Sequence, residues 1–210
     1  MPPTPSRVNN PTTHTRRRRR PEEAEAEILD ATRDLLTRLP GEQVTVSAVM
    51  AATTLSRKSF YVYFADRNEL LRRLLDPLAA RRDSIIEPVY AADSLVLAGQ
   101  EALHGLARFY LEHGRLLRAL AHAAAHDDDT RRAWRGFMEP VVDAHVRLVE
   151  LEIAAGRISG IDPEPTVRAL LAMNLQYFFD ELVDNPAPDV DAVASTLTTV
   201  WGRVLYGTAR

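Results

Sequence analysis

Arg57 and Lys58 lie side by side in the stretch SRKSFYVYF, directly before a cluster of aromatic residues. Guanidinium and ammonium groups can donate hydrogen bonds to guanine O6 and N7 in the major groove of DNA, and to phosphates. Tyrosine hydroxyls, as at Tyr61 and Tyr63, can reach the phosphate backbone. The stretch therefore indicates a nucleic-acid contact. The alternative is a solvated charged pair on a helix surface.

The elements around this stretch would give it a defined position. An amphipathic helix is predicted from Glu22 to a stop at LPG, and a short second helix begins after Thr45, a plausible N-cap. The sequence TLS makes a tight connection to a third helix capped by Ser56. Phe60 and Phe64 are expected in a small core with Val49 and Leu35. This is the layout of a helix-turn-helix, whose second helix enters the major groove by its leading residues.

A basic segment precedes the first helix. Residues 1–21 combine Pro, Thr and Asn with five consecutive arginines and show no apolar period, which predicts a disordered arm. Such arms reach an adjacent minor groove or phosphates, and the alternative is a solubilising tail. The arginines are Arg16, Arg17, Arg18, Arg19 and Arg20.

The composition restricts the class of protein. The chain has 210 residues, a formal net charge of -3 and no cysteine, so disulfides and thiolate metal sites are excluded. Any affinity for nucleic acid must come from local clusters of arginine. No apolar run reaches the roughly 18 to 20 residues that span a bilayer, and no signal peptide is recognisable. We therefore expect a cytoplasmic protein.

The rest of the chain is also predicted to be helical. Abundant Ala and Leu, without alternation typical of strands, predict an all-α fold. A fourth helix follows Asp66, and Pro77 is expected to kink or break it. Further helical segments are predicted over residues 83–92, 95–113, 115–126, 130–155, 163–184 and 190–206. The expected domains are the arm 1–21, the helix-turn-helix 22–68 and a second helical domain 69–210.

The stretch TVSAVMAATTLSRKSFYVYFADRNELL resembles the DNA-binding signature of the TetR family of transcriptional regulators. The family positions correspond to Thr45, Ser56, Tyr61, Phe64 and Arg67. Thr54 stands where the family usually has Gly, so the turn is expected to be shaped differently or mildly strained. The residues expected to contact DNA, besides the five arginines of the arm, are Thr45, Ser56, Arg57, Lys58, Ser59, Tyr61, Tyr63 and Arg67.

The resemblance implies further properties. A TetR-type protein would be a homodimer that reads a palindromic operator with two recognition helices, and a repressor released when a small apolar ligand enters its C-terminal domain. It would be no enzyme and would need no cofactor. The last two helices would form the dimer face, for which the candidates are Val167, Leu170, Leu171, Leu182, Val193, Leu197 and Val200.

A stripe of large side chains in the C-terminal half could line the ligand pocket. Trp134, Met138, Val141 and His145 follow one another at steps of four, three and four, one face of a helix, although such a stripe can also be plain core. The segments AWRGFMEPVV, LLAMNLQYFF and TVWGRVLYG are similar to the ligand domain of ethionamide-resistance regulators in the TetR family. The resemblance and the spacing together assign to the pocket Phe109, His113, Trp134, Met138, Val141, His145, Asn174, Phe178 and Trp201.

Two other classes of function, an enzyme and a protein-protein interaction module, are alternatives to a DNA-binding regulator. His122 and His126, before three aspartates, could share a metal ion in an enzyme, but the chain has no His-Glu-x-x-His pattern, Gly-rich phosphate loop or nucleophile elbow. We therefore expect no metal. A helical protein-protein interaction module would explain the amphipathic helices but not the ordered cationic and tyrosine pattern after Ser56.

Overall fold

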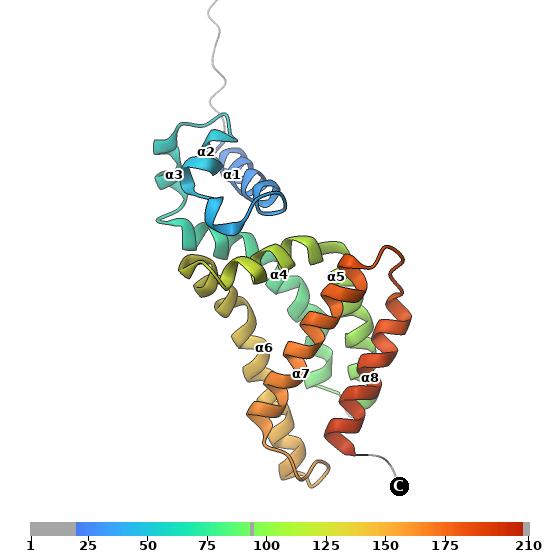
Figure 1. The fold of residues 1–210 in the computed structure, drawn as a ribbon. Helices are drawn as coiled ribbons and strands as arrows, with labels where there is room; N and C mark the ends of the chain where they lie inside the picture. The colour runs from blue at the N-terminus through green and yellow to red at the C-terminus, as the bar shows by residue number, and fades with distance from the viewer. Residues whose placement is uncertain (1–19, 93–94, 208–210) are drawn as a thin grey trace, which may run out of the picture.

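The computed structural model describes residues 20–92 and 95–207, and for residues 95–97 the backbone alone. All regular secondary structure in this part of the chain is helical (Figure 1). The all-α prediction is therefore confirmed.

A small helical bundle forms the N-terminal end. Its elements are α1 (Pro21–Leu36), the 3₁₀ turn η1 (Gly41–Gln43), α2 (Val46–Ala51) and α3 (Arg57–Tyr63). Thr45 caps α2 as predicted, since its hydroxyl oxygen accepts the backbone N–H of Ala48 at 3.1 Å. The expected aromatic core is also present, because Phe60 and Phe64 are buried together with Val49.

Helix α4 (Arg67–Tyr90) joins this bundle to the C-terminal helices. Of the kink or break predicted at Pro77, the break is absent, because the helix is continuous there. It also includes most of the segment 83–92 that was expected to be separate. Leu74 and Leu75, in the turn that precedes the proline, are buried, so tertiary packing outweighs the loss of one backbone hydrogen bond. The boundary expected at residue 68 falls in the first turn of this shared helix.

The C-terminal helices are α5 (Leu95–Ala124), α6 (Asp128–Ala154), α7 (Pro163–Phe178), its π-helical continuation η2 (Phe179–Asp184) and α8 (Val190–Tyr206). Helices α5 and α6 pack against α4, while α7 packs on α6 and α8 on α5 (Figure 1). The break expected within α5 at Gly114 is absent. A Cβ on Gly114 would lie 2.4 Å from Val183 Cγ2, so this glycine permits close packing of η2 rather than ending a helix.

Most residues suggested for the dimer face are in the core of the single chain. Five are buried within this chain and therefore cannot meet a partner: Val167, Leu170, Leu182, Val193 and Leu197. Leu171 lines an internal cavity, whereas Val200 is half-buried. Spacing alone predicted that α7 and α8 have apolar faces. It did not predict whether each face packs in the core of the same chain or against a partner.

Arg67 ties the N-terminal bundle to the C-terminal helices. Its Nη2 donates to the carbonyl of Gly41 at 2.7 Å and its Nε to that of Val44 at 2.8 Å. Its Nη1 binds Asp127 Oδ1 at 2.5 Å, and its side chain is only 12% exposed. The interpretation of Arg67 as a DNA contact is therefore corrected, because its guanidinium is committed to the junction between the two parts.

Gly41 brings the two parts into direct contact beside this ion pair. A Cβ on Gly41 would lie 2.1 Å from the Cβ of Ala123, near the end of α5. Even the smallest side chain at position 41 would therefore force η1 and α5 apart.

We expect Gly41→Ala to lower the free energy of unfolding by about 1 to 3 kcal/mol, because the added methyl group overpacks a tight contact. Gly136→Ala is the matched control. Gly136 lies within α6 with nothing within 4 Å of its Cβ position, so alanine there should be neutral or stabilise by about 0.5 to 1 kcal/mol. Urea unfolding measures both, and equal effects would contradict the tight contact.

We expect Asp127→Asn to destabilise the fold in a pH-dependent way. Partial burial alone would raise the pKa of Asp127, but hydrogen bonds from Thr130 and Arg67 outweigh it and hold that pKa below its usual value. Asparagine preserves the cap of α6 and removes the charge, at a cost of about 1 to 3 kcal/mol at neutral pH.

This difference should be complete above the unfolded carboxyl pKa of about 4 and should disappear as the pH falls through the lowered native value. Urea unfolding of both proteins from pH 7 to pH 3 measures it. A difference that stays constant over this range would contradict a charged Asp127 at the junction.

Candidate functional site: an exposed helix and an internal cavity

The leading turn of α3 is presented to solvent. Phe60 and Phe64 anchor the rear of this helix in the core, while Arg57 and Lys58 are exposed at its start. Within the described residues neither cation has an ion pair or a side-chain hydrogen bond. Tyr61 is 60% exposed further along the helix, whereas Tyr63 is half-buried against the core. The helix can therefore offer both cations and one tyrosine hydroxyl to a partner.

The connection between α2 and α3 is unstrained. Among the described residues only three glycines have positive φ, so Thr54 does not need the left-handed conformation that a glycine would favour. Its backbone N–H donates to Glu27 Oε1 at 2.6 Å, which fixes the turn on α1. Ser56 occupies the N-cap position, but its hydroxyl pairs with that of Ser59 at 2.9 Å instead of capping a backbone N–H.

One arginine of the basic arm is described. Arg20 precedes α1 and its side chain, 78% exposed, pairs with Glu23 at 2.9 Å. The other four, Arg16 to Arg19, lie outside the described residues, so their predicted contact with DNA stays a prediction.

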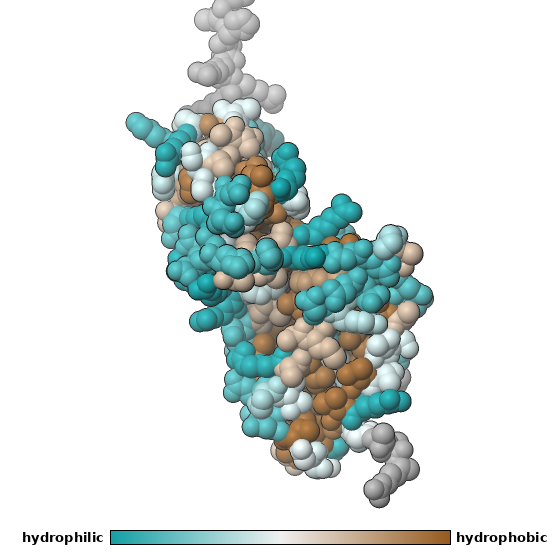
Figure 2. Space-filling view, viewed as in Figure 1, coloured by the Kyte–Doolittle hydropathy of each residue, from teal (hydrophilic) through white to brown (hydrophobic). Residues whose placement is uncertain are grey.

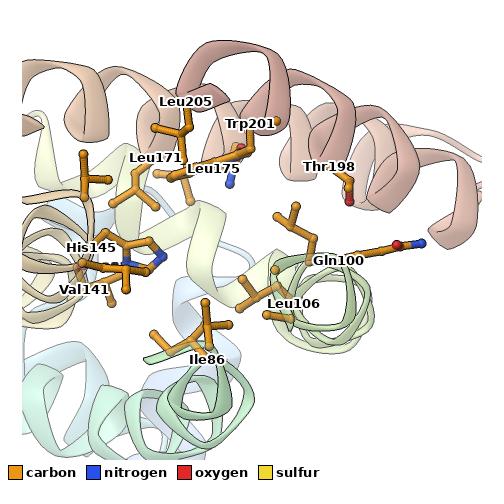
Figure 3. Close-up of a pocket in the computed structure, with 18 of the residues that line it drawn as sticks. Ile86, Gln100, Leu106, Val141, His145, Leu171, Leu175, Thr198, Trp201 and Leu205 are labelled. Carbon is orange, nitrogen blue, oxygen red and sulfur yellow. Dashed lines mark hydrogen bonds between the residues drawn. The ribbon is translucent and has the colours of Figure 1, made fainter. Parts of the chain in front are cut away.

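An internal cavity of about 140 Å³ lies among α4 to α8, and its wall is mostly apolar. Figure 3 shows Ile86, Leu106, Val141 and Leu171 directed into it from four helices. Exposed Gln100 and half-buried Thr198 line its other side. A mostly apolar cavity with a few polar groups is the usual form of a small-molecule site.

Six of the nine residues predicted for the pocket line this cavity. They are Met138, Val141, His145, Asn174, Phe178 and Trp201.

Phe109, His113 and Trp134 do not line it, which corrects the prediction. Phe109 is buried in the core with its ring 5.1 Å from that of His113. Trp134 stacks on Phe137 at 5.4 Å. Tyr110, the neighbour of Phe109, lines the cavity, because consecutive helical residues point in different directions.

Polar residues of the wall are held by specific hydrogen bonds. Asn174 is buried, and its Oδ1 accepts the indole N–H of Trp201 at 3.0 Å. His145 Nδ1 lies 2.8 Å from the carbonyl of Val141 and 3.3 Å from the hydroxyl of Tyr90. Burial lowers the pKa of His145 and raises that of Tyr90 to about 12, so both are uncharged at neutral pH.

Sequence reasoning missed two charged residues of the wall. Arg82 is 4% exposed and Glu152 5%, although such residues are rarely buried without partners. Arg82 binds Asp83 and the carbonyl of Phe137, and its guanidinium lies 4.2 Å above the Phe137 ring. Arg82 lies four residues after Leu78 and four before Ile86, on the same face of the helix. This position among apolar residues was the signal that could have identified it.

The described part of the chain contains neither a candidate metal site nor a helix that could span a membrane. Within residues 20–92 and 95–207, no cluster of three or more His, Cys, Asp or Glu side chains could hold an ion. His122 and His126 face each other at 5.5 Å between ring centres, without such a cluster. None of the described helices combines the length and apolar character needed to cross a membrane.

Comparison with known proteins connects both halves of the site. Residues 28–74 match the family of bacterial regulatory proteins called the tetR family, and residues 99–207 match the C-terminal domain of transcriptional regulator EthR. The chain is 28% identical, over 92% of both proteins, to the HTH-type transcriptional regulator EthR of Mycolicibacterium smegmatis.

Solved structures share the fold. A TetR-family transcriptional regulator from Syntrophomonas wolfei has a TM-score of 0.73 at 17% identity, covering 88% of this chain and 96% of that one. The fatty acid degradation regulator FadR from Bacillus halodurans has a TM-score of 0.70 at 13% identity, covering 91% and 98%.

These matches disfavour the enzyme and interaction-module alternatives, since the families concerned are transcriptional regulators. An N-terminal helix-turn-helix joined to an EthR-type C-terminal domain places this chain in the TetR family of DNA-binding transcriptional regulators.

Proposed function

We propose that this protein is a cytoplasmic, homodimeric repressor that leaves a palindromic operator when a small apolar ligand enters the cavity. The main support for this proposal is that α4 contacts both the N-terminal bundle and the cavity. Its first residue, Arg67, binds two carbonyls of the N-terminal bundle, and its later residues Arg82, Ile86 and Val89 line the cavity. A ligand that changes the packing of α4 would thereby change the position of α3.

On the DNA side, Arg57 and Lys58 would contact base edges, and Tyr61 would contact the backbone. Their exposure, and the burial of the opposite side of α3, support contact with DNA through this face of the helix. Thr45, Ser56, Ser59 and Tyr63 remain proposed backbone contacts, and the arginines of the arm would add phosphate or minor-groove contacts.

The proposed dimer face lies on the outer side of α7 and α8. Figure 2 shows apolar side chains gathered over these two helices. Many of the residues left at least partly exposed on these two helices are small or apolar, which permits close helix contact. They are Ala169, Ala172, Met173, Tyr177, Ser195, Thr199, Val200 and Val204.

The name of one similar protein is compatible with an apolar effector. The regulator from Bacillus halodurans is described as a regulator of fatty acid degradation. The cavity of this chain is likewise bordered mainly by aliphatic and aromatic side chains.

Replacing Arg57 and Lys58 together by Ala should weaken specific DNA binding by several kcal/mol, since a good base contact contributes about 1 to 3 kcal/mol. Tyr61→Phe should instead weaken binding to all sequences alike, because it removes a backbone contact. Fluorescence anisotropy on a duplex from the region upstream of the gene, and on a scrambled duplex, measures both.

A salt series separates the two contributions, because phosphate contacts give a steep dependence of affinity on salt. If both variants lost specificity equally, the division between base and backbone contacts would be wrong. If the wild-type protein bound both duplexes equally and weakly, the assignment of this upstream region as operator would be refuted.

Ala172→Arg should convert the dimer to a monomer, because it places a long charged side chain in a face of small residues. Ser84→Arg is the matched control, since Ser84 is exposed on α4, away from this face. Light scattering after size-exclusion chromatography gives the masses. A dimeric Ala172→Arg protein at low micromolar concentration would place the interface elsewhere.

A further inference from the structure

Three polar atoms of the cavity wall have hydrogen-bonding capacity that the described residues leave unused. They are the hydroxyl of Tyr110, Nε2 of His145 and Nδ2 of Asn174. Among the described residues, the fully enclosed side-chain atoms without a hydrogen-bond partner are Asn68 Oδ1 and His113 Nε2. The three atoms of the wall are not among these, and their residues line the cavity.

The surroundings of His145 determine which of its nitrogens carries the proton. Nδ1 lies 2.8 Å from the carbonyl oxygen of Val141, which can only accept a hydrogen bond. Nδ1 must therefore carry the hydrogen, and in the neutral ring Nε2 is an acceptor. Burial and the nearby charge of Arg82 both lower the pKa of His145 and so favour the neutral ring.

Asn174 offers the complementary group. Its Oδ1 is already occupied by the indole N–H of Trp201 at 3.0 Å, so its remaining group is the Nδ2 donor. Trp201 also contacts the ring of His145, at 5.8 Å between centroids, so His145 and Asn174 both lie beside the same indole. The wall thus presents one acceptor and one donor close to Trp201.

The charged residues of the wall already have partners. Nε and Nη2 of Arg82 donate to Asp83 Oδ1 at 2.9 and 2.6 Å. Glu152 accepts from Arg157 Nε at 2.8 Å and from the hydroxyl of Tyr206 at 3.4 Å. A charged ligand group would therefore be desolvated without gaining an unpaired opposite charge, which is unfavourable.

We propose that the cavity selects uncharged amphiphiles whose head group carries both a hydrogen-bond donor and an acceptor, as a primary carboxamide does. His145 Nε2 would accept from the ligand N–H and make His145 the residue that sets this preference. Asn174 Nδ2 would donate to the ligand carbonyl, and the tail would lie along the apolar wall. This inference rests on the proposed role of the cavity as the effector site.

Octanamide and nonan-2-one form a suitable pair of probes, because they share the tail and the carbonyl and differ by NH₂ against CH₃. Isothermal titration calorimetry of the full chain, without DNA, gives the ratio of their affinities. In His145→Leu, which lacks the acceptor, the affinity for octanamide relative to that for nonan-2-one should fall by about tenfold. In His145→Gln, which restores an acceptor oxygen, part of the preference should return.

The ketone serves as an internal control for the shape of the cavity. Its affinity should be similar in the wild type and in His145→Leu, provided that circular dichroism gives both proteins the same helix content. A ratio that changes by less than about twofold would overturn the assignment of His145. Tighter binding of octanoate or octylammonium than of octanamide would overturn the proposed preference for an uncharged head group. Absence of octanamide binding would overturn it as well.

Anisotropy on DNA, measured on the same preparations, separates this inference from the proposed function. Intact specific DNA binding with no amide preference would refute only the ligand chemistry. If the wild-type protein bound no duplex specifically, neither the upstream duplex nor an operator selected from random DNA, the repressor proposal itself would be refuted.

Discussion

The hydrogen bonds of the Arg67 guanidinium fix the position of the N-terminal bundle on the rest of the molecule. They connect the carbonyls of Gly41 and Val44 to Asp127 at the start of α6. Charge-assisted hydrogen bonds of this kind are short and directional, and the planar guanidinium can hold several acceptors at once. Lysine could not replace this geometry, because a single ammonium group cannot reach carbonyls and carboxylate in the same fork.

Helix α4 extends the effect of this junction into the C-terminal half. The helix that begins with Arg67 carries Arg82 and Ile86 in the cavity wall fifteen or more residues later, without interruption at Pro77. A continuous helix moves largely as a unit, so the packing at one end constrains the other. The cavity and the N-terminal bundle that carries α3 thus contact different parts of one continuous helix.

The sequence predicted the features that depend on local spacing. The cap at Thr45, the buried pair Phe60 and Phe64 and the end of α8 follow from residues a few positions apart, which helical geometry places on one face. Which helix lies opposite a given face depends on tertiary packing, so Arg67 was misassigned and Phe109 was exchanged with its neighbour Tyr110. Arg82 was missed because a buried charge depends on partners, here Asp83 and Phe137, whose geometry spacing does not specify.

The proposed repressor presents two copies of α3 together, one helical turn of DNA apart. Because the chain has no cysteine, Val62→Cys, at a position 75% exposed on α3, gives a single site for a spin label. Double electron-electron resonance on operator DNA should give one narrow distance between the two spin labels. This distance should equal the helix spacing of about 34 to 36 Å plus the length that the two labels add. Absence of dipolar coupling between labels on DNA would mean that the protein binds as a monomer and would contradict the account.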